Sequence, residues 1–250
     1  MLIAEVGLNH FGKLFEAFNI LQKLLETKID AVTFQIRESK FYSDKFENFS
    51  LPISTYKELS EITRSAGKKF GLAISDASLI DIMDPYCDFF KILSKDIGNR
   101  EILNIFNNTS SDTEIFLSTG NSDYFEIKEA SDAFDRNITL IHTRLSNEVG
   151  DVNLKSMKIM KILFPNNKIA FGNHCRNLNV MYASVGFDPS DYFFYVKDEE
   201  LKTPPDDLHA IRLNEVDKFC ENITQLQKAV GDGLRNKTKN TIEGQLWKRL

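Results

Sequence analysis

Short apolar segments alternate with amphipathic segments along nearly the whole chain, and this alternation constrains the fold more than any other feature. Apolar residues recur with helical spacing in the amphipathic segments, while the apolar segments have the length and composition of buried strands. The pattern predicts strands over residues 2–7, 31–36, 70–75, 89–94, 114–119, 138–145, 168–174 and 192–196. It predicts helices over residues 13–26, 54–66, 77–83, 97–106, 123–134, 154–164, 179–185 and 213–230, and a long loop over residues 38–52.

Strands that are connected through helices pair in parallel and are covered by helices. Eight such units in a chain of 250 residues favour a closed (β/α)8 TIM barrel of the α/β class. An open doubly wound sheet is the alternative. It usually has a glycine-rich phosphate-binding turn after its first strand, and Leu8-Asn9-His10-Phe11-Gly12 is not such a turn. We therefore expect one domain over residues 1–230 and a weakly patterned tail over residues 231–250.

Charge and cysteine usage narrow the class of protein. The formal net charge of −5 argues against a nucleic-acid partner, although a local pocket can still bind an anion. Cys87, Cys175 and Cys220 lie far apart, so the sequence predicts no disulfide framework and no zinc ribbon. No apolar run approaches the roughly 20 residues that span a bilayer. With no recognisable secretion signal at the first strand, we expect a cytoplasmic protein with no membrane partner.

Polar side chains follow most of the predicted strands, where a barrel carries its active site. The set comprises Glu5, Asn9, His10, Gln35, Arg37, Ser75, Asp76, Lys91, Ser94, Asp96, Ser118, Thr119, His142, Arg144, Asn173 and His174. Glu5 and Lys91 stand out because each lies inside an apolar strand, where a charge requires a partner or a function. Two interpretations remain open here. The set forms an anion-binding barrel mouth, or it forms a layer of paired charges.

Several motifs resemble those of the sialic acid synthases, which make N-acetylneuraminate and its pseudaminate and legionaminate relatives. Ile3-Ala4-Glu5-Val6-Gly7-Leu8-Asn9-His10-Phe11-Gly12 resembles the opening motif of that family. Further similar segments follow in the family's order: Ala31–Gln35, Phe90–Asp96, Leu117–Gly120, Leu140–His142, Asp151–Leu154, Gly172–His174 and Thr203–Asp206. The resemblance covers residues 2–230 and implies a (β/α)8 barrel. It also implies a homodimer.

The resemblance implies condensation of phosphoenolpyruvate with the aldehyde form of an N-acetylhexosamine, giving a nonulosonic acid. A divalent metal, Mn²⁺ or Mg²⁺, would polarise the aldehyde. By position, the residues that bind phosphoenolpyruvate would be Lys91, Ser94, Ser118 and Thr119. Glu5 and Asp96 would handle protons, Gln35 and Asp206 would hold the amino sugar, and His174 would bind the metal. The strand-end residues Asn9, His10, His142 and Arg144 complete the candidate substrate site, with Glu5, Asp96 and Lys91 as its catalytic residues.

The sequence also departs from the family pattern. Four positions differ from the residue types that the family has there: Thr33 replaces a phosphate-binding lysine, Ala73 a threonine, Leu145 an asparagine and Gly172 a serine. Tyr195 stands where the family has its second metal-binding histidine, and a phenol with a pKa near ~10 is a poor Mn²⁺ ligand. His209 is a candidate substitute.

These departures leave alternatives open. The chain is a divergent synthase, a barrel with altered carbon–carbon bond chemistry, or a non-catalytic sugar-acid-binding partner of an intact synthase. Residues 231–250 resemble the linker before an antifreeze-like domain that the given sequence lacks.

Overall fold

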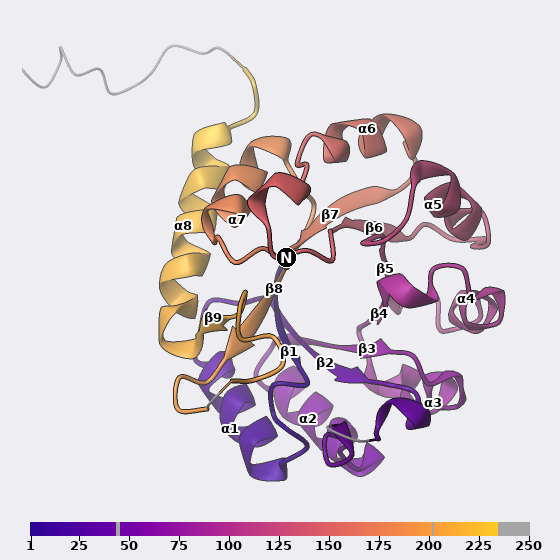
Figure 1. Cartoon of the computed structure of the whole chain (residues 1–250), viewed down its shortest axis with the longest axis vertical. Coiled ribbons are helices and arrows are strands. Elements are labelled where there is room, and N and C mark those ends of the chain that lie inside the picture. Colours follow the sequence, from indigo (N-terminus) through magenta and orange to yellow (C-terminus); the bar gives the residue numbers. More distant parts are fainter. Residues whose placement is uncertain (44–45, 202, 235–250) are drawn as a thin grey trace, which may run out of the picture.

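The strands close into a parallel barrel in a computed structural model that describes residues 1–43, 46–201 and 203–234. Neighbours in sequence pair in register from the first strand to the eighth, and β1 also pairs with β8, which closes the barrel (Figure 1). The strands are β1 (Leu2–Gly7), β2 (Ala31–Ile36), β3 (Lys69–Ile74), β4 (Phe89–Ile92), β5 (Glu114–Ser118), β6 (Thr139–His142), β7 (Lys168–Gly172) and β8 (Tyr192–Lys197). The expected (β/α)8 fold is confirmed.

Helices surround the strands and cover their outer faces (Figure 1). They are α1 (Leu14–Leu25), α2 (Ile53–Ser65), α3 (Ala77–Met83), α4 (Arg100–Asn107), α5 (Tyr124–Ser131), α6 (Ser156–Leu163), α7 (Asn179–Ser184) and α8 (Val216–Val230). No helix in the described part of the chain has the length and hydropathy of a membrane span. Of the expected tail, residues 235–250 lie outside the described residues.

The expected strands over 70–75 and 114–119 end one residue early, and three others end at least two residues earlier than the sequence pattern predicted. The expected strands over 89–94, 138–145 and 168–174 end at Ile92, His142 and Gly172. Beyond β4 the chain turns into a 3-10 helix, Ser94–Asp96, because its polar residues bond to neighbouring loops instead of continuing the ladder. The expected helix over 97–106 begins at Arg100, since Asn99 accepts a hydrogen bond from Ile102 N and caps it.

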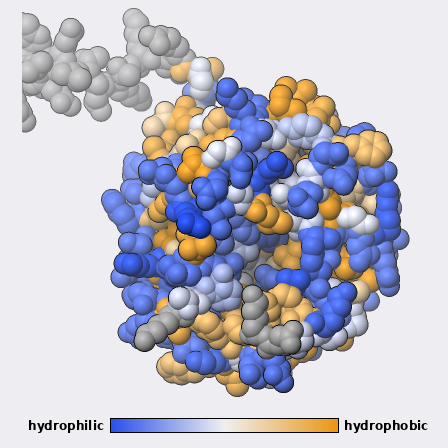
Figure 2. Space-filling view, viewed as in Figure 1, coloured by the Kyte–Doolittle hydropathy of each residue, from blue (hydrophilic) through white to orange (hydrophobic). Residues whose placement is uncertain are grey.

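Several short elements were not predicted. Among them, the loop over 38–52 contains a 3-10 helix, Ser39–Phe41, and the loop after β8 contains β9 (Ile211–Arg212). β9 pairs with Val196 and Lys197 and returns the chain to the barrel wall before α8. The space-filling view in Figure 2 shows apolar residues scattered among hydrophilic ones over this face of the molecule.

The barrel interior is filled by two layers of side chains, because alternate residues of a strand point to the same face. The lower layer is an apolar cluster of Ile3, Ala31, Phe89, Phe116, Ile141, Ala170 and Phe193. The rings of Phe116 and Phe193 meet edge to face at 5.1 Å. Gly71 belongs to this layer, and a Cβ there would lie 2.2 Å from the Phe89 ring. The absent side chain therefore makes room for the aromatic floor.

Two residues further along each strand lies a second inward layer with a different composition. Its members are Glu5, Thr33, Ala73, Lys91, Ser118, Thr143, Gly172 and Tyr195. We call this set the upper layer. It rests on the aromatic floor and faces the carboxyl end of the barrel, so the fold brings one residue from each strand to the place where a barrel carries its chemistry.

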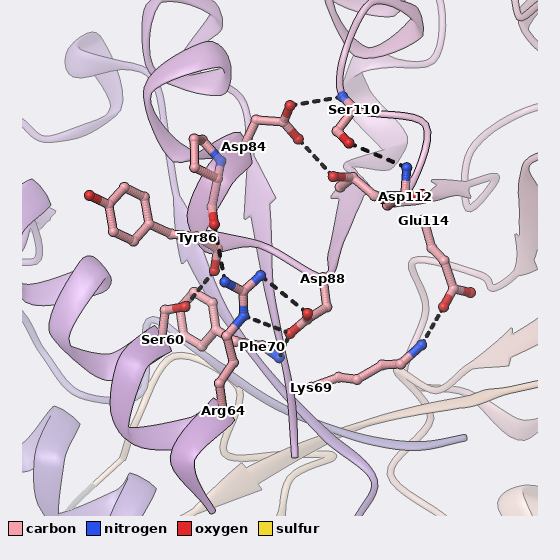
Figure 3. Close-up of polar contacts among 12 residues, drawn as sticks. Ser60, Arg64, Lys69, Phe70, Asp84, Tyr86, Asp88, Ser110, Asp112 and Glu114 are labelled. Atoms are coloured by element: carbon pink, nitrogen blue, oxygen red, sulfur yellow. Dashed lines mark hydrogen bonds and ion pairs between the residues drawn. The ribbon is translucent and has the colours of Figure 1, made fainter. Parts of the chain in front are cut away.

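The opposite end of the barrel holds a dense set of polar contacts between the starts of β3, β4 and β5 (Figure 3). Asp88 accepts a hydrogen bond of 2.8 Å from Phe70 N and forms an ion pair with Arg64. Asp84 accepts bonds of 2.8 Å from Ser110 N and from Thr113 Oγ1. These carboxylates tie successive loops together, which is a structural role.

Candidate active site at the carboxyl end of the barrel

A buried ion pair between Glu5 and Lys91 lies at the centre of the upper layer. The side chains of Lys91 and Glu5 are 5% and 3% exposed. Lys91 Nζ also lies 5.1 Å from the centroid of the Phe193 ring, so the aromatic floor supports the ammonium from below. Each buried charge therefore has a partner of opposite sign. This pair agrees with the interpretation as paired charges, and its position is compatible with the interpretation as an anion-binding mouth. The charges are paired, and the pair faces the barrel mouth.

Asn9 connects the first strand to the loop after the eighth. Its Nδ2 donates to Val196 O at 2.8 Å, and its Oδ1 accepts from Asp206 N at 3.1 Å. Gly7 adopts a left-handed conformation with φ of 56°, and a Cβ there would lie 3.1 Å from both Asp206 Oδ2 and the Tyr195 ring. The opening motif thus brings Asp206 beside the ion pair from a position about two hundred residues away.

Burial, and after it the neighbouring charge of Glu5, raise the pKa of Asp206 to about 7 against the opposing effect of Lys91. A carboxyl group that titrates near neutral pH can both donate and accept a proton. Asp206 therefore meets the requirement for proton transfer, a role that the resemblance had assigned to Glu5 and Asp96.

Three aromatic rings gather next to Asp206. The centroids of His174 and His209 are 4.9 Å apart, and Tyr195 contacts His209 edge to face at 4.8 Å. Burial lowers the pKa of His174 to about 3 and that of His209 to about 4, and the charge of Lys91 acts in the same direction. Burial and the charges of Glu5 and Asp206 raise the pKa of Tyr195. Both imidazoles and the phenol are therefore neutral at pH 7.

Neutral imidazoles are metal ligands, so the donor set can be compared with the metal that the resemblance implies. Both ring nitrogens of His209 are buried without a hydrogen-bond partner, and its Nε2 lies 3.6 Å from Asp206 Oδ1. Within the described residues no three His, Cys, Asp or Glu side chains stand close enough to enclose a metal ion. The neutral rings of His174 and His209 are therefore two neighbouring donors that suit a divalent metal. Tyr195, as a neutral phenol, does not contribute.

Asp96 contacts Ser75 and Lys95. Ser75 Oγ donates to Asp96 Oδ2 at 2.6 Å, and Lys95 Nζ contacts Asp96 Oδ1 at 2.8 Å. Lys95 also pairs with Glu38 at 3.2 Å. Both carboxylate oxygens of Asp96 are occupied, so its contacts link the loops after β2, β3 and β4.

Two predicted site residues face the helices rather than the barrel interior. His142 Nε2 lies 2.9 Å from Val152 O, and its ring stacks on Phe171. His10 is fully buried, with its Nδ1 accepting from Gly12 N. The period of two in β6 explains the first case, because Thr143, and not His142, follows Ile141 on the inward face.

The remaining candidates lie at different depths around the mouth. Ser94 accepts a bond of 3.0 Å from Gly120 N, and Ser118 belongs to the upper layer. Thr119 Oγ1 donates to Ile141 O at 2.8 Å, which ties two strand ends together. Arg144 is exposed and lines a pocket of about 420 Å³ between the loops after β5 and β6. Gln35 is half-buried on the inward face of β2.

Buried polar atoms without a partner mark this end of the barrel. Among the described residues they occur on His10, Ser118, Ser122, Thr143 and His209. Each of these residues lies at or after the carboxyl end of a strand, although His10 faces the helices. Buried polar groups in native proteins are nearly always hydrogen-bonded, so the unpartnered groups that face the mouth, on Ser118, Thr143 and His209, are candidates for contact with a ligand or water. Sequence reasoning missed Thr143, and named His209 only as a substitute, because strand register and loop return decide where both lie.

Comparison with known proteins agrees with the fold and the motifs. Residues 15–235 match the model of the NeuB family. N,N'-diacetyllegionaminic acid synthase of Campylobacter jejuni is 26% identical over 270 residues, which cover 96% of this chain and 80% of that protein. An uncharacterized protein of Methanocaldococcus jannaschii is 28% identical over 250 residues, covering 93% of this chain and 72% of that protein.

Solved structures extend the comparison of the fold. The N-acetylneuraminic acid synthetase of Leptospira borgpetersenii has a TM-score of 0.86 and 19% identity, covering 99% of this chain and 90% of that one. A spore coat polysaccharide biosynthesis protein of Bacillus subtilis has a TM-score of 0.78 and 20% identity, covering 99% and 76%. The family model covers most of the sequence, and the barrel places the family's motifs at one mouth. The chain belongs to the NeuB family.

Proposed function

We propose that this protein condenses phosphoenolpyruvate with the aldehyde of an N-acetylhexosamine-type sugar to give a nonulosonic acid. The observation that carries the proposal is the buried Glu5–Lys91 pair with Asp206 and two neutral imidazoles beside it, at the mouth of a NeuB-family barrel. A transferase of this kind needs a cation for an acidic substrate, a group that moves protons near neutral pH, and an electrophilic site for the aldehyde. Each of these has a candidate in the upper layer or directly above it.

In the proposed reaction, the enol carbon of phosphoenolpyruvate forms a bond to the aldehyde carbon, and the aldehyde oxygen takes up a proton to become a hydroxyl. Water then adds to the resulting oxocarbenium carbon, loses a proton, and phosphate leaves. Lys91, with the hydroxyls of Ser94 and Ser118, would bind the acid substrate. Asp206 would supply the proton to the sugar oxygen, with Glu5 holding the ammonium of Lys91 in place. Gln35, on the inward face above, would contact the sugar.

A divalent cation, Mn²⁺ or Mg²⁺, is part of this proposal. His174 and His209 would hold it, and it would polarise the aldehyde carbonyl for attack. Both rings are neutral at pH 7, so no proton has to leave a ring before a metal binds.

A second candidate function rests on the composition of the upper layer. Lys91 is the single cation among its eight positions. The resemblance implies that Thr33 and Ala73 stand in place of phosphate-contacting residues, and that Gly172 stands in place of a serine. That composition favours a barrel that forms or breaks a carbon–carbon bond with less dependence on phosphate. A non-catalytic sugar-acid-binding partner of an intact synthase would also fit this composition.

The experiment that tests the proposal measures phosphate release from phosphoenolpyruvate with a panel of N-acetylhexosamines, in Mn²⁺, Mg²⁺ or EDTA. We expect sugar-dependent release with metal that is lost in Lys91→Met. Lys69→Met, which removes a lysine from the amino end of the barrel, is the matched control and should retain release. Pyruvate-dependent turnover without phosphate release would favour altered chemistry. Silence with every sugar, together with binding to a full-length synthase, would favour the non-catalytic partner.

Assembly and location are tested separately. We propose a homodimer, which light scattering after size-exclusion chromatography would detect. Cys87, Cys175 and Cys220 are buried free thiols, and free thiols are typical of reducing compartments, in keeping with a cytoplasmic location.

A further inference from the structure

Thr143 carries a buried hydroxyl that has no hydrogen-bond partner. The residue is 3% exposed and follows Ile141 of the lower layer by two positions, so its side chain belongs to the upper layer. A hydroxyl without a partner in such a place costs free energy unless something else binds it. The fold therefore keeps an unused hydrogen-bonding group at the site mouth.

Two glycines leave space around this hydroxyl. A Cβ at Gly172 would lie 3.6 Å from Thr143 Oγ1 and 2.9 Å from Ile141 Cγ2. A Cβ at Gly120 would lie 3.1 Å from Thr143 Cγ2 and 2.8 Å from Ser94 Oγ. A side chain at residue 120 would press on the Thr143 methyl group, whereas one at residue 172 would meet the Thr143 hydroxyl at an ordinary contact distance. With glycine at both positions, neither residue offers a side chain to the buried Thr143 hydroxyl.

Thr143 is one of three hydroxyls on neighbouring strand ends. Ser118 Oγ is also buried and unpartnered, on the strand beside Thr143. Ser94 Oγ already accepts from Gly120 N, so its own proton is free to be donated elsewhere. A Cβ at Gly120 would lie close to both Ser94 Oγ and the Thr143 methyl group, so these two residues approach the same glycine. Three hydroxyl donors on adjacent strand ends suit one oxyanion group, such as a carboxylate or a phosphate.

We propose that Thr143 is a substrate-contacting residue that donates a hydrogen bond to the oxyanion group of the acid substrate, together with Ser94 and Ser118. This inference deepens the proposed function and rests on it, since it names the residue that holds one end of the three-carbon acid. It also gives a reason for Gly172, because the Thr143 hydroxyl lies beside the position that a side chain at residue 172 would use.

Isothermal titration of the full chain with phosphoenolpyruvate, pyruvate or inorganic phosphate tests the proposal. Thr143→Val removes the hydroxyl at constant shape, Thr143→Ser restores it, and Thr139→Val makes the same change at the amino end of the same strand. We expect Thr143→Val to weaken binding of the bound acid by about 10- to 100-fold, the effect of one hydrogen bond to a charged group. Thr143→Ser and Thr139→Val should bind within a few-fold of the wild type. In turnover assays, Thr143→Val should raise KM more than it lowers kcat.

Comparing the three ligands distinguishes failure of the proposed role of Thr143 from failure of the proposed function. Equal binding of phosphoenolpyruvate by Thr143→Val and by the wild type would overturn the role of Thr143 and leave the proposed function intact. Binding of pyruvate or phosphate alone, weakened by Thr143→Val, would support the oxyanion contact and count against a phosphoenolpyruvate synthase. No binding of any of the three by a folded wild type would overturn both.

Discussion

The two ends of the barrel are built from the same strands but treat their polar groups in opposite ways. At the amino end, the carboxylates of Asp84 and Asp88 accept hydrogen bonds from backbone and side-chain donors (Figure 3). Arg136 donates to several backbone carbonyls of the neighbouring loop. At the carboxyl end, hydroxyls and imidazoles such as those of Thr143 and His209 are buried without partners. The polar groups of the first end are satisfied within the protein, whereas several at the second end are not. The difference teaches that the two ends of one barrel can satisfy their buried polar groups to very different degrees, and it adds the unpartnered groups to the buried charges as markers of the candidate site.

The largest test of this comparison is Lys91→Met. It leaves the Glu5 carboxylate buried without its partner, so we expect a loss of about 3–5 kcal/mol in the free energy of unfolding. Binding and turnover should fall by about 10²- to 10³-fold, the effect of removing one preorganised charge. Urea denaturation and the phosphate-release assay measure the two effects.

The double variant Lys91→Met/Glu5→Gln is the control for that change. It removes both charges, so it should recover much of the stability while activity stays lost. Equal stability of the single and double variants would show that the unpaired Glu5 carboxylate does not cause the loss in the free energy of unfolding.

His209→Phe tests whether the carboxyl end holds a metal. The ring volume stays while both nitrogens disappear, so we expect Mn²⁺ affinity to fall at least about 10-fold, with little change in stability because those nitrogens have no partner to lose. Titration followed by Mn²⁺ electron paramagnetic resonance measures affinity without any turnover. His142→Gln, on the helix-facing side of β6, should bind Mn²⁺ like the wild type. Undiminished affinity in His209→Phe would remove His209 from the metal site.

Asp88→Ala tests the opposite end. The change removes the acceptor of Phe70 N and the partner of Arg64, so we expect a loss of about 1–3 kcal/mol in the free energy of unfolding. Substrate affinity should remain at the wild-type value, because Asp88 is at the amino end of β4. A change in affinity with unchanged stability would contradict the division between the two ends.

The smallest expected effect concerns pH. Asp206 has a pKa of about 7 in the folded protein and about 4 in an unfolded chain, so between these values the folded state binds the extra proton. Its contribution to stability therefore declines as pH rises from about 4 to about 7 and stays low above that. Asp206→Asn should be more stable than the wild type by about 1–2 kcal/mol at pH 8, a modest value because partial exposure to solvent screens the charge. The advantage should be smaller at pH 5, because the wild-type carboxyl group is then protonated in the folded protein. Urea denaturation at both pH values measures the difference. An advantage that grows toward acid would contradict the assignment.

Much of the fold could be predicted because strand and helix patterns are local. The alternation from Leu2 to Val230 gave the right elements in the right order, and the apolar strands implied parallel pairing. Strand ends were harder, since the residues after Ile92 and His142 continue an apolar or β-branched pattern while their polar groups bond to neighbouring loops. The pair Val196–Ile211 had no sequence signal, because two residues of a strand are too few to form a pattern.

The candidate site could be predicted only where a charge lies inside an apolar strand. Glu5 and Lys91 stood out for that reason, and the structure places them in contact. His142 was assigned to the site although it faces the helices, because the inward register of β6 depends on the closed barrel. His209 lies beside His174 only because β9 and Asn9 return the loop to the mouth, and this contact spans most of the chain.

The aromatic floor has a consequence for how such a barrel can change. Phe89, Phe116 and Phe193 seal the interior beneath the site, so the residues above them contribute little to the hydrophobic free energy that holds the strands together. Positions such as Thr33, Ala73 and Gly172 can therefore exchange lysine, threonine or serine for other types while the fold persists. Because the aromatic floor stabilises the barrel independently of the residues above it, substitutions at the mouth can change the substrate or the reaction while the fold is kept.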